Sequence, residues 1–144
     1  MLDKTVEDFI KRNEGLRLKP YKCSADKLTI GYGRNIEDNG ISITEAELML
    51  SSDIVSVAEE IRRLIPDFDS LDLPQKTALI DMGFNLGITR LGKFKLMIKA
   101  INVRDFKTAA IELLDSEYAN QLPHRSSKNA QLIQINLDSN KEPR

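Results

Sequence analysis

The chain has 144 residues, of which 41% are apolar and 30% are charged, with seven glycines and five prolines. This length and composition suit a folded, helix-leaning protein that buries a core of its own. A formal net charge of −1 and the lack of any long apolar stretch exclude a globally basic nucleic-acid binder and a membrane-spanning protein, so neither nucleic acid nor stable membrane insertion is expected.

The N-terminal segment is predicted to form an amphipathic helix. Val6, Phe9 and Ile10 recur at helical spacing between charged residues, so we expect this helix to end near Asn13, with Glu14 at its C-terminal edge. The segment lacks the continuous apolar run of a signal peptide. This predicts synthesis in the cytoplasm without a signal peptide.

Residues 21–32 break into short pieces that are typical of strands and turns. The polar stretch 24–26 separates two such pieces, and Thr29 and Ile30 in the second piece precede Gly31. The pattern predicts a small antiparallel hairpin.

A long helix is predicted next. Ser42 and Glu45 have the spacing of a capping box, in which each residue bonds the other's backbone N–H. Apolar residues then step by four and three until Pro66 ends the helix, which gives a helix over residues 44–65.

The remaining chain is predicted to be helical. One helix opens at Asp72 and ends at Gly87. Two amphipathic segments follow at 94–101 and 106–113, and a last helix begins near Arg125.

These elements predict a mainly helical α+β protein with two lobes in one domain. Residues 12–43 with the first helix form a small hairpin lobe, 44–65 the connecting helix and 72–137 a helical C-terminal lobe, followed by a polar tail at 138–144. We expect the ligand site in a cleft between the lobes.

One segment is strongly basic. Between residues 90 and 107 a single acid, Asp105, is opposed by Arg90, Lys93, Lys95, Lys99, Arg104 and Lys107. This is either a solvated helix face or a surface that attracts an anionic polymer.

Glycosidic hydrolysis needs a carboxylic acid that protonates the leaving oxygen, and a second group that guides water or stabilises the transition state. Glu14, Cys23 and Thr29 have eight and five residues between them. The stretch EGLRLKPYKCSADKLTIGYG that contains them resembles the active-site segment of phage-type lysozymes, including those of T-even bacteriophages. The similarity continues through ALIDMGFNLG at 78–87 and through 109–125, whereas 36–72 match only in length and helical pattern.

The resemblance implies a two-lobed lysozyme-like fold and assigns roles to several residues. Glu14 would be the general acid, Cys23 the second catalytic group and Thr29 the residue that positions the attacking water, with inversion at the anomeric carbon. Arg125 would lie against Glu14, although it could equally be a plain helix N-terminal residue. The C-terminal end of a helix favours a protonated carboxyl, whereas a nearby guanidinium favours an ionised one. The sequence therefore leaves the protonation state of Glu14 open.

Cys23 stands where an aspartate is the more familiar residue of the family. We interpret it as a thiolate that guides water. A covalent nucleophile that would retain the anomeric configuration, and a small buried apolar residue, are the alternatives.

Phe84, Asn85 and Asn35 are predicted to contact substrate, as the resemblance implies. Phe84 could instead belong to the core, and Asn35 could be a simple turn residue. Arg34 replaces the histidine of the T-even phage enzymes, which puts in doubt any interaction that this histidine makes.

The predicted function is that of an endolysin, a muramidase that hydrolyses the β-1,4 bond between N-acetylmuramic acid and N-acetylglucosamine of peptidoglycan and lyses the host cell. A lytic transglycosylase and a non-catalytic peptidoglycan-binding module are the alternatives. We expect a monomer that acts on glycan strands in the periplasm after release through a holin pore, as the family resemblance suggests. Cys23 is the single cysteine, and His124, which we expect on the surface, is the single histidine. We therefore expect no disulfide, metal or cofactor.

Overall fold

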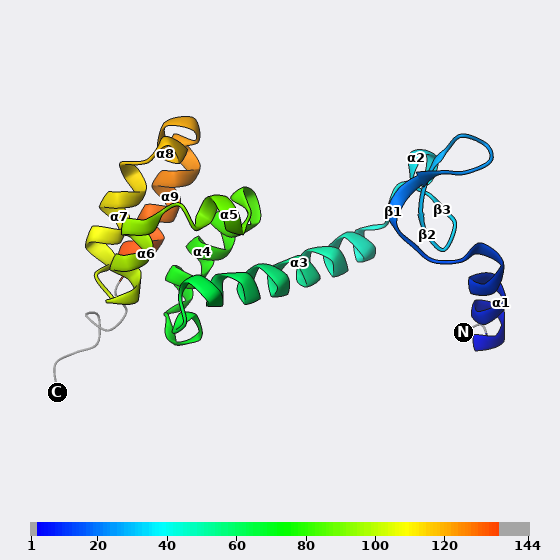
Figure 1. Ribbon diagram of the computed structural model, residues 1–144, viewed down its shortest axis with the longest axis horizontal. Coiled ribbons are helices and arrows are strands. Elements are labelled where there is room, and N and C mark those ends of the chain that lie inside the picture. Colours follow the sequence, from blue (N-terminus) through cyan, green and yellow to red (C-terminus); the bar gives the residue numbers. More distant parts are fainter. Residues whose placement is uncertain (1–2, 136–144) are drawn as a thin grey trace. The chain divides into compact units, whose positions relative to one another are not determined.

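The computed structural model describes residues 3–135 (Figure 1). Contacts along the chain divide it into two compact units, one up to Met49 and one from Leu50 on. The predicted mainly helical α+β class is confirmed, since helices accompany one small antiparallel sheet. The predicted tail at 138–144 lies outside the described residues.

The first unit combines a helix with a three-stranded sheet. In chain order its elements are α1 (Lys4–Glu14), β1 (Arg17–Lys22), β2 (Leu28–Gly31), β3 (Arg34–Asn35), α2 (Ile36–Asn39) and the start of α3 (Ile43–Leu64). The sheet order is β1-β2-β3, and both pairings are antiparallel. The predicted hairpin is confirmed, although its first strand begins at Arg17 rather than at residue 21, and β3 extends it by a third, two-residue strand.

Helix α3 begins at the predicted capping box. The Ser42 backbone N–H donates to Glu45 Oε1 at 2.8 Å, and the Glu45 N–H donates to Ser42 Oγ at 3.1 Å. Of its side chains only Ala58 and Ile61 are buried, and both lie in its C-terminal half.

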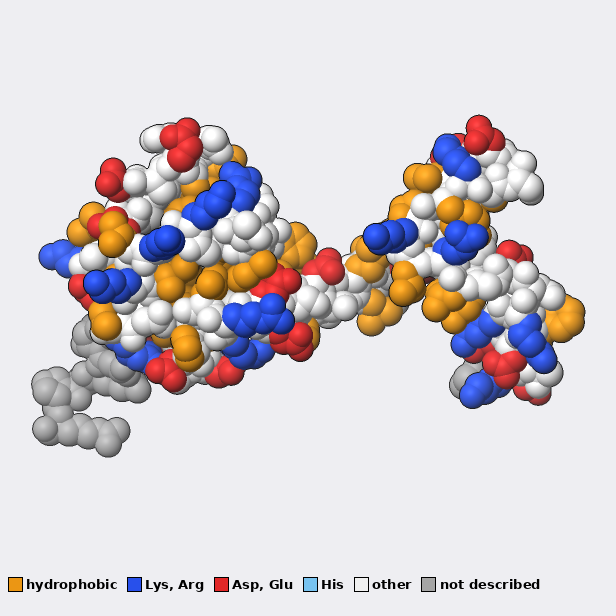
Figure 2. Space-filling view, in the orientation of Figure 1, with side chains coloured by type: hydrophobic (Ala, Val, Ile, Leu, Met, Phe, Trp, Pro, Cys, Tyr) orange, Lys and Arg blue, Asp and Glu red, His pale blue; other side chains and the backbone are white. Residues whose placement is uncertain are grey.

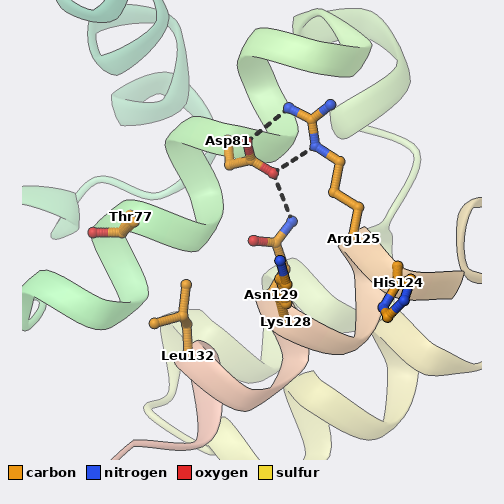
Figure 3. Close-up of a pocket in the computed structure, with 7 residues that line it drawn as sticks. All are labelled: Thr77, Asp81, His124, Arg125, Lys128, Asn129 and Leu132. Carbon is orange, nitrogen blue, oxygen red and sulfur yellow. Dashed lines mark hydrogen bonds and ion pairs between the residues drawn. The ribbon is translucent and has the colours of Figure 1, made fainter. Parts of the chain in front are cut away.

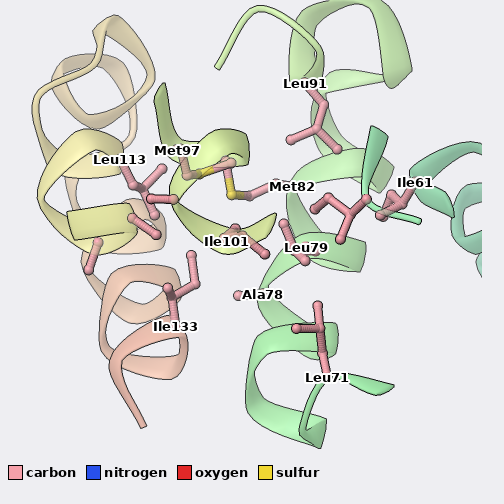
Figure 4. Close-up of a cluster of buried hydrophobic side chains, with 14 of the residues drawn as sticks. Ile61, Leu71, Ala78, Leu79, Met82, Leu91, Met97, Ile101, Leu113 and Ile133 are labelled. Carbon is pink, nitrogen blue, oxygen red and sulfur yellow. The ribbon is translucent and has the colours of Figure 1, made fainter. Parts of the chain in front are cut away.

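The second unit consists of helices around one apolar core (Figure 4). After a 3-10 turn, η1 (Phe68–Ser70), come α4 (Leu73–Leu86), α5 (Ile88–Leu91), α6 (Lys95–Asn102), α7 (Phe106–Leu114), α8 (Glu117–Gln121) and α9 (Pro123–Gln134). Helix α7 packs against α6 and α9, and α9 also packs against α4. The predicted helices at 94–101 and 106–113 are α6 and α7. Within residues 3–135, no helix is both long and apolar enough to span a membrane.

Two contacts hold α4 close to its neighbours. Gly83 allows a close approach to α3, because a Cβ atom at this position would lie 2.8 Å from Val57 Cγ1. The buried Gln75 amide donates to the Ile133 carbonyl at 3.0 Å and to the Ile135 carbonyl, which ties α4 to the C-terminal end of α9. Helix α4 is therefore firmly placed, and with it the residues it presents to solvent.

Candidate active site

Glu14 is the last residue of α1. Gly15 ends the helix with a φ of +71°, a conformation that glycine adopts readily, and its N–H donates to the Lys11 carbonyl at 2.8 Å. The Glu14 side chain is exposed. The predicted position at the helix edge is confirmed, and it leaves the carboxyl accessible to a ligand.

The turn between β2 and β3 lies against the end of α1. A Cβ atom built on Gly33 would be 2.5 Å from Glu14 Oε2 and 2.8 Å from Glu14 Cδ, so the carboxyl rests directly on the Gly33 backbone. One turn earlier in α1, Lys11 Nζ lies 5.4 Å from the centroid of the Tyr32 ring, as in a cation–π contact. These two contacts place the end of α1, and with it Glu14, against the turn between β2 and β3.

Cys23 lies at the start of the turn that joins β1 and β2. Its N–H donates to the Lys27 carbonyl at 3.0 Å, and its carbonyl accepts from the Asp26 N–H at 2.9 Å. The half-buried thiol has a pKa below its ordinary value, chiefly because of a hydrogen bond from the Lys27 backbone and next because of one from the Ala25 backbone. A lowered pKa increases the thiolate fraction at neutral pH, which a base or a nucleophile requires.

Thr29 lies in the middle of the sheet, opposite Tyr21 in β1 and Asn35 in β3. It is 3% exposed, and its hydroxyl donates to the Lys27 carbonyl at 2.8 Å. A hydroxyl has a single proton, so the Thr29 oxygen retains its lone pairs as acceptors. The structure therefore brings Cys23 and Thr29 together around the Lys27 backbone.

Asn35 caps α2. Its Oδ1 accepts from the Asp38 N–H and its Nδ2 donates to Asp38 Oδ2, both at 3.0 Å. Both ends of the amide are therefore occupied within the first unit, and the expected contact of Asn35 with substrate stays a prediction.

Arg34 pairs with Glu45, the capping residue of α3. Arg34 Nη1 lies 2.8 Å from Glu45 Oε1, and Nη2 lies 2.6 Å from Oε2. The guanidinium and the Ser42 backbone N–H together lower the pKa of Glu45 to about 2. The sequence indicated the capping role of Glu45, whereas this ion pair was not foreseen.

Arg125 pairs with Asp81 in the second unit (Figure 3). Arg125 Nε and Nη2 donate to the two carboxylate oxygens of Asp81 at 2.8 and 2.7 Å, and Asn129 Nδ2 donates to Asp81 Oδ2 at 2.9 Å. The pKa of Asp81 lies below its ordinary value, chiefly because of the hydrogen bonds from the Arg125 guanidinium. Partial burial raises this pKa by a smaller amount, and the hydrogen bond from Asn129 lowers it. These groups line a pocket of about 560 Å³ between α4 and α9.

The expected partner of Arg125 was Glu14, which belongs to the other unit, and that pairing stays a prediction. Sequence reasoning missed Asp81. Its signal was available, because a carboxylate within the apolar run of α4 needs a partner when it is partly buried. His124, expected on the surface, is exposed at the start of α9 and lines the same pocket.

Phe84 is not a core residue. Its side chain is 48% exposed and lines an apolar groove of about 450 Å³ within the second unit, together with Leu50, Ile54 and Ile80. Asn85 is also exposed. Both are therefore open to solvent on α4, and their contact with sugar stays a prediction.

The basic residues Arg90, Lys93, Lys95 and Lys99 are at least partly exposed on and around α5 and α6. On the face shown in Figure 2, however, basic and acidic side chains alternate over the second unit. This mixture is typical of a solvated surface. Among residues 3–135, no group of three or more potential metal-binding side chains is present.

Known proteins are similar in sequence to most of this chain. A family model described as phage lysozyme matches residues 11–129. Probable T4-type lysozyme 2 of Dictyostelium discoideum is 28% identical over 153 residues, covering 86% of this chain and 90% of that protein. An endolysin of Acyrthosiphon pisum secondary endosymbiont phage 1 is 38% identical over 110 residues (74% of this chain, 73% of the endolysin). A SAR-endolysin of bacteriophage PS119 is 35% identical over 114 residues (74% and 64%). The range matched by the family model contains Glu14, Cys23, Thr29 and Arg125.

Proposed function

Because this chain belongs to the phage lysozyme family and is a glycosidase, we propose that it hydrolyses the β-1,4 bond between N-acetylmuramic acid and N-acetylglucosamine in bacterial peptidoglycan. The observation that carries this proposal is the exposed Glu14 carboxyl, which lies against Gly33 beside the hairpin that bears Cys23 and Thr29. An acid and a water-guiding pair on one small unit are the groups that glycoside hydrolysis requires.

In the proposed reaction, Glu14 protonates the leaving glycosidic oxygen. The Thr29 oxygen, whose own proton is donated to the Lys27 carbonyl, accepts a hydrogen bond from the attacking water. The Cys23 thiolate accepts the proton that this water loses as it attacks the anomeric carbon. Attack by water from the face opposite the leaving group inverts the anomeric configuration.

A covalent route through the Cys23 sulfur is the competing mechanism, since a thiolate is also a strong nucleophile. The two routes differ in their product. NMR of the fresh reducing end distinguishes them, because inversion supports the water-guiding role and retention supports a glycosyl-cysteine intermediate.

We propose that the chain acts in the periplasm, as a monomer, on the glycan strands of the cell wall. A holin pore would release it from the cytoplasm. Lysis of the host cell would follow from cleavage of the wall.

Mass spectrometry of digested peptidoglycan tests the function. Hydrolysis predicts new reducing ends, a lytic transglycosylase predicts anhydro ends and a binding module predicts no product. The variant Glu14→Gln removes the proton donor, so we expect the loss of about a hundred- to ten-thousandfold in rate while folding is retained. Near wild-type activity of this variant would refute the assignment of Glu14.

A further inference from the structure

The shortest strand of the sheet supports the turn that touches Glu14. Strand β3 has only two residues, and its ladder with β2 consists of the pairs Thr29–Asn35 and Ile30–Arg34. A strand this short contributes little stability on its own. The position of the turn between β2 and β3 must therefore depend on other contacts.

The Arg34–Glu45 ion pair supplies such a contact. It joins β3 to the first turn of α3 through a hydrogen bond of 2.8 Å from Arg34 Nη1 to Glu45 Oε1 and an ionic contact of 2.6 Å between Nη2 and Oε2. A second bond from Arg34 Nη1 reaches the Gly40 carbonyl at 3.4 Å, and Glu45 is itself held by Ser42. A guanidinium and a carboxylate that meet at two atom pairs fix orientation as well as distance.

Gly33 connects this ion pair to the catalytic acid. It directly precedes Arg34, and its α-carbon is the surface on which the Glu14 carboxyl rests. A shift of β3 relative to α3 would therefore move Gly33 and remove the support of Glu14.

We propose that Arg34 and Glu45 are positioning residues for the reaction, because their ion pair holds the β2–β3 turn where Gly33 orients the Glu14 carboxyl. The proposal rests on the role of Glu14 given above. Neither residue touches the reacting atoms, so their effect is on the rate of the chemical step rather than on substrate binding.

The variants Arg34→Gln and Glu45→Gln test this assignment. Glutamine at 45 keeps the capping-box pattern while it removes the charge, so the start of α3 stays intact. The matched control is Arg62→Gln, because Arg62 makes a similar twofold contact with Asp69, at 2.9 and 2.8 Å, in the second unit. All three variants should fold, since exposed ion pairs contribute little to stability.

We expect kcat to fall about tenfold in Arg34→Gln and in Glu45→Gln, with KM unchanged, because small displacements of a reacting group are costly. The double variant should be no slower than either single variant, and Arg62→Gln should keep wild-type kcat. An NMR cross-peak between the Gly33 Hα and Glu14 Hγ protons should weaken in the Arg34 and Glu45 variants alone.

The cross-peak reports the contact between Gly33 and Glu14 without any need for catalysis, so it tests the positioning role independently of the proposed function. Its selective loss supports the positioning role even if the wild-type protein releases no sugar product, a result that would refute the function alone. An unchanged cross-peak with kcat within twofold of wild type would overturn the positioning role. Equal losses of kcat in the Arg34 and Arg62 variants would also overturn it.

Discussion

Replacing Gly33 with alanine puts a methyl group where the Glu14 carboxyl lies. The new Cβ atom would be 2.5 Å from Glu14 Oε2, whereas ordinary contacts begin near 3.4 Å. The carboxyl must therefore retreat by about 1 Å, and a misplacement of this size can cost about a hundredfold in rate. Alanine at a φ of +73° also strains the backbone by about 1–2 kcal/mol.

Gly31→Ala is the matched control, because Gly31 has a φ of +69° but no neighbouring atom within 4 Å of the place that a methyl group would take. Both variants should lose similar stability in thermal denaturation, and only Gly33→Ala should lose most of its activity on purified peptidoglycan. Equal activities of the two variants would show that the contact with Gly33 does not orient Glu14.

Two further predictions concern Cys23 and Arg125. Activity should rise with pH as the Cys23 thiol loses its proton, and this rise should occur below the ordinary thiol range because the pKa of Cys23 is lowered. Thiol alkylation should inhibit the protein, whereas Cys23→Asp should be active and resistant to alkylation. A fully active Cys23→Ala in the same pH–rate measurement would leave Cys23 with no catalytic part. Arg125→Ala should lower the free energy of unfolding by about 0.5–1 kcal/mol, since Asp81 loses its partner and the pair is partly exposed. Arg63→Ala should leave the free energy of unfolding unchanged, because the Arg63 side chain makes no ion pair within residues 3–135. Identical melting temperatures of the two variants would remove Arg125 from any structural role.

Local signals in the sequence predicted the helix boundaries well. The capping box of α3 and the Gly87 end of α4 depend on neighbouring residues only, so their patterns can be read from sequence. The short elements β3, α2, α5 and α8 were not foreseen. Elements of two to five residues are stabilised mainly by packing against the rest of the fold, which leaves little periodicity to detect.

The resemblance assigns catalytic roles within one short segment, because Glu14, Cys23 and Thr29 lie within 16 consecutive residues. Those roles stay predictions. The Asp81–Arg125 pair joins residues 44 positions apart, and no periodicity reports such a contact. Phe84 shows a third case, because its helical spacing fitted both the core and the surface until its exposure was known.

The close approach at Gly83 has a consequence for how sequences in this family can diverge. With the Val57 methyl 2.8 Å from the place of a Cβ atom, any larger residue at position 83 creates a steric clash between α4 and α3. A smaller residue at position 57 would relieve that clash, while either change alone leaves an overpacked or an underfilled interface. Positions 57 and 83 are therefore expected to covary, so that the sum of their side-chain volumes is held nearly constant across relatives that keep this helix spacing.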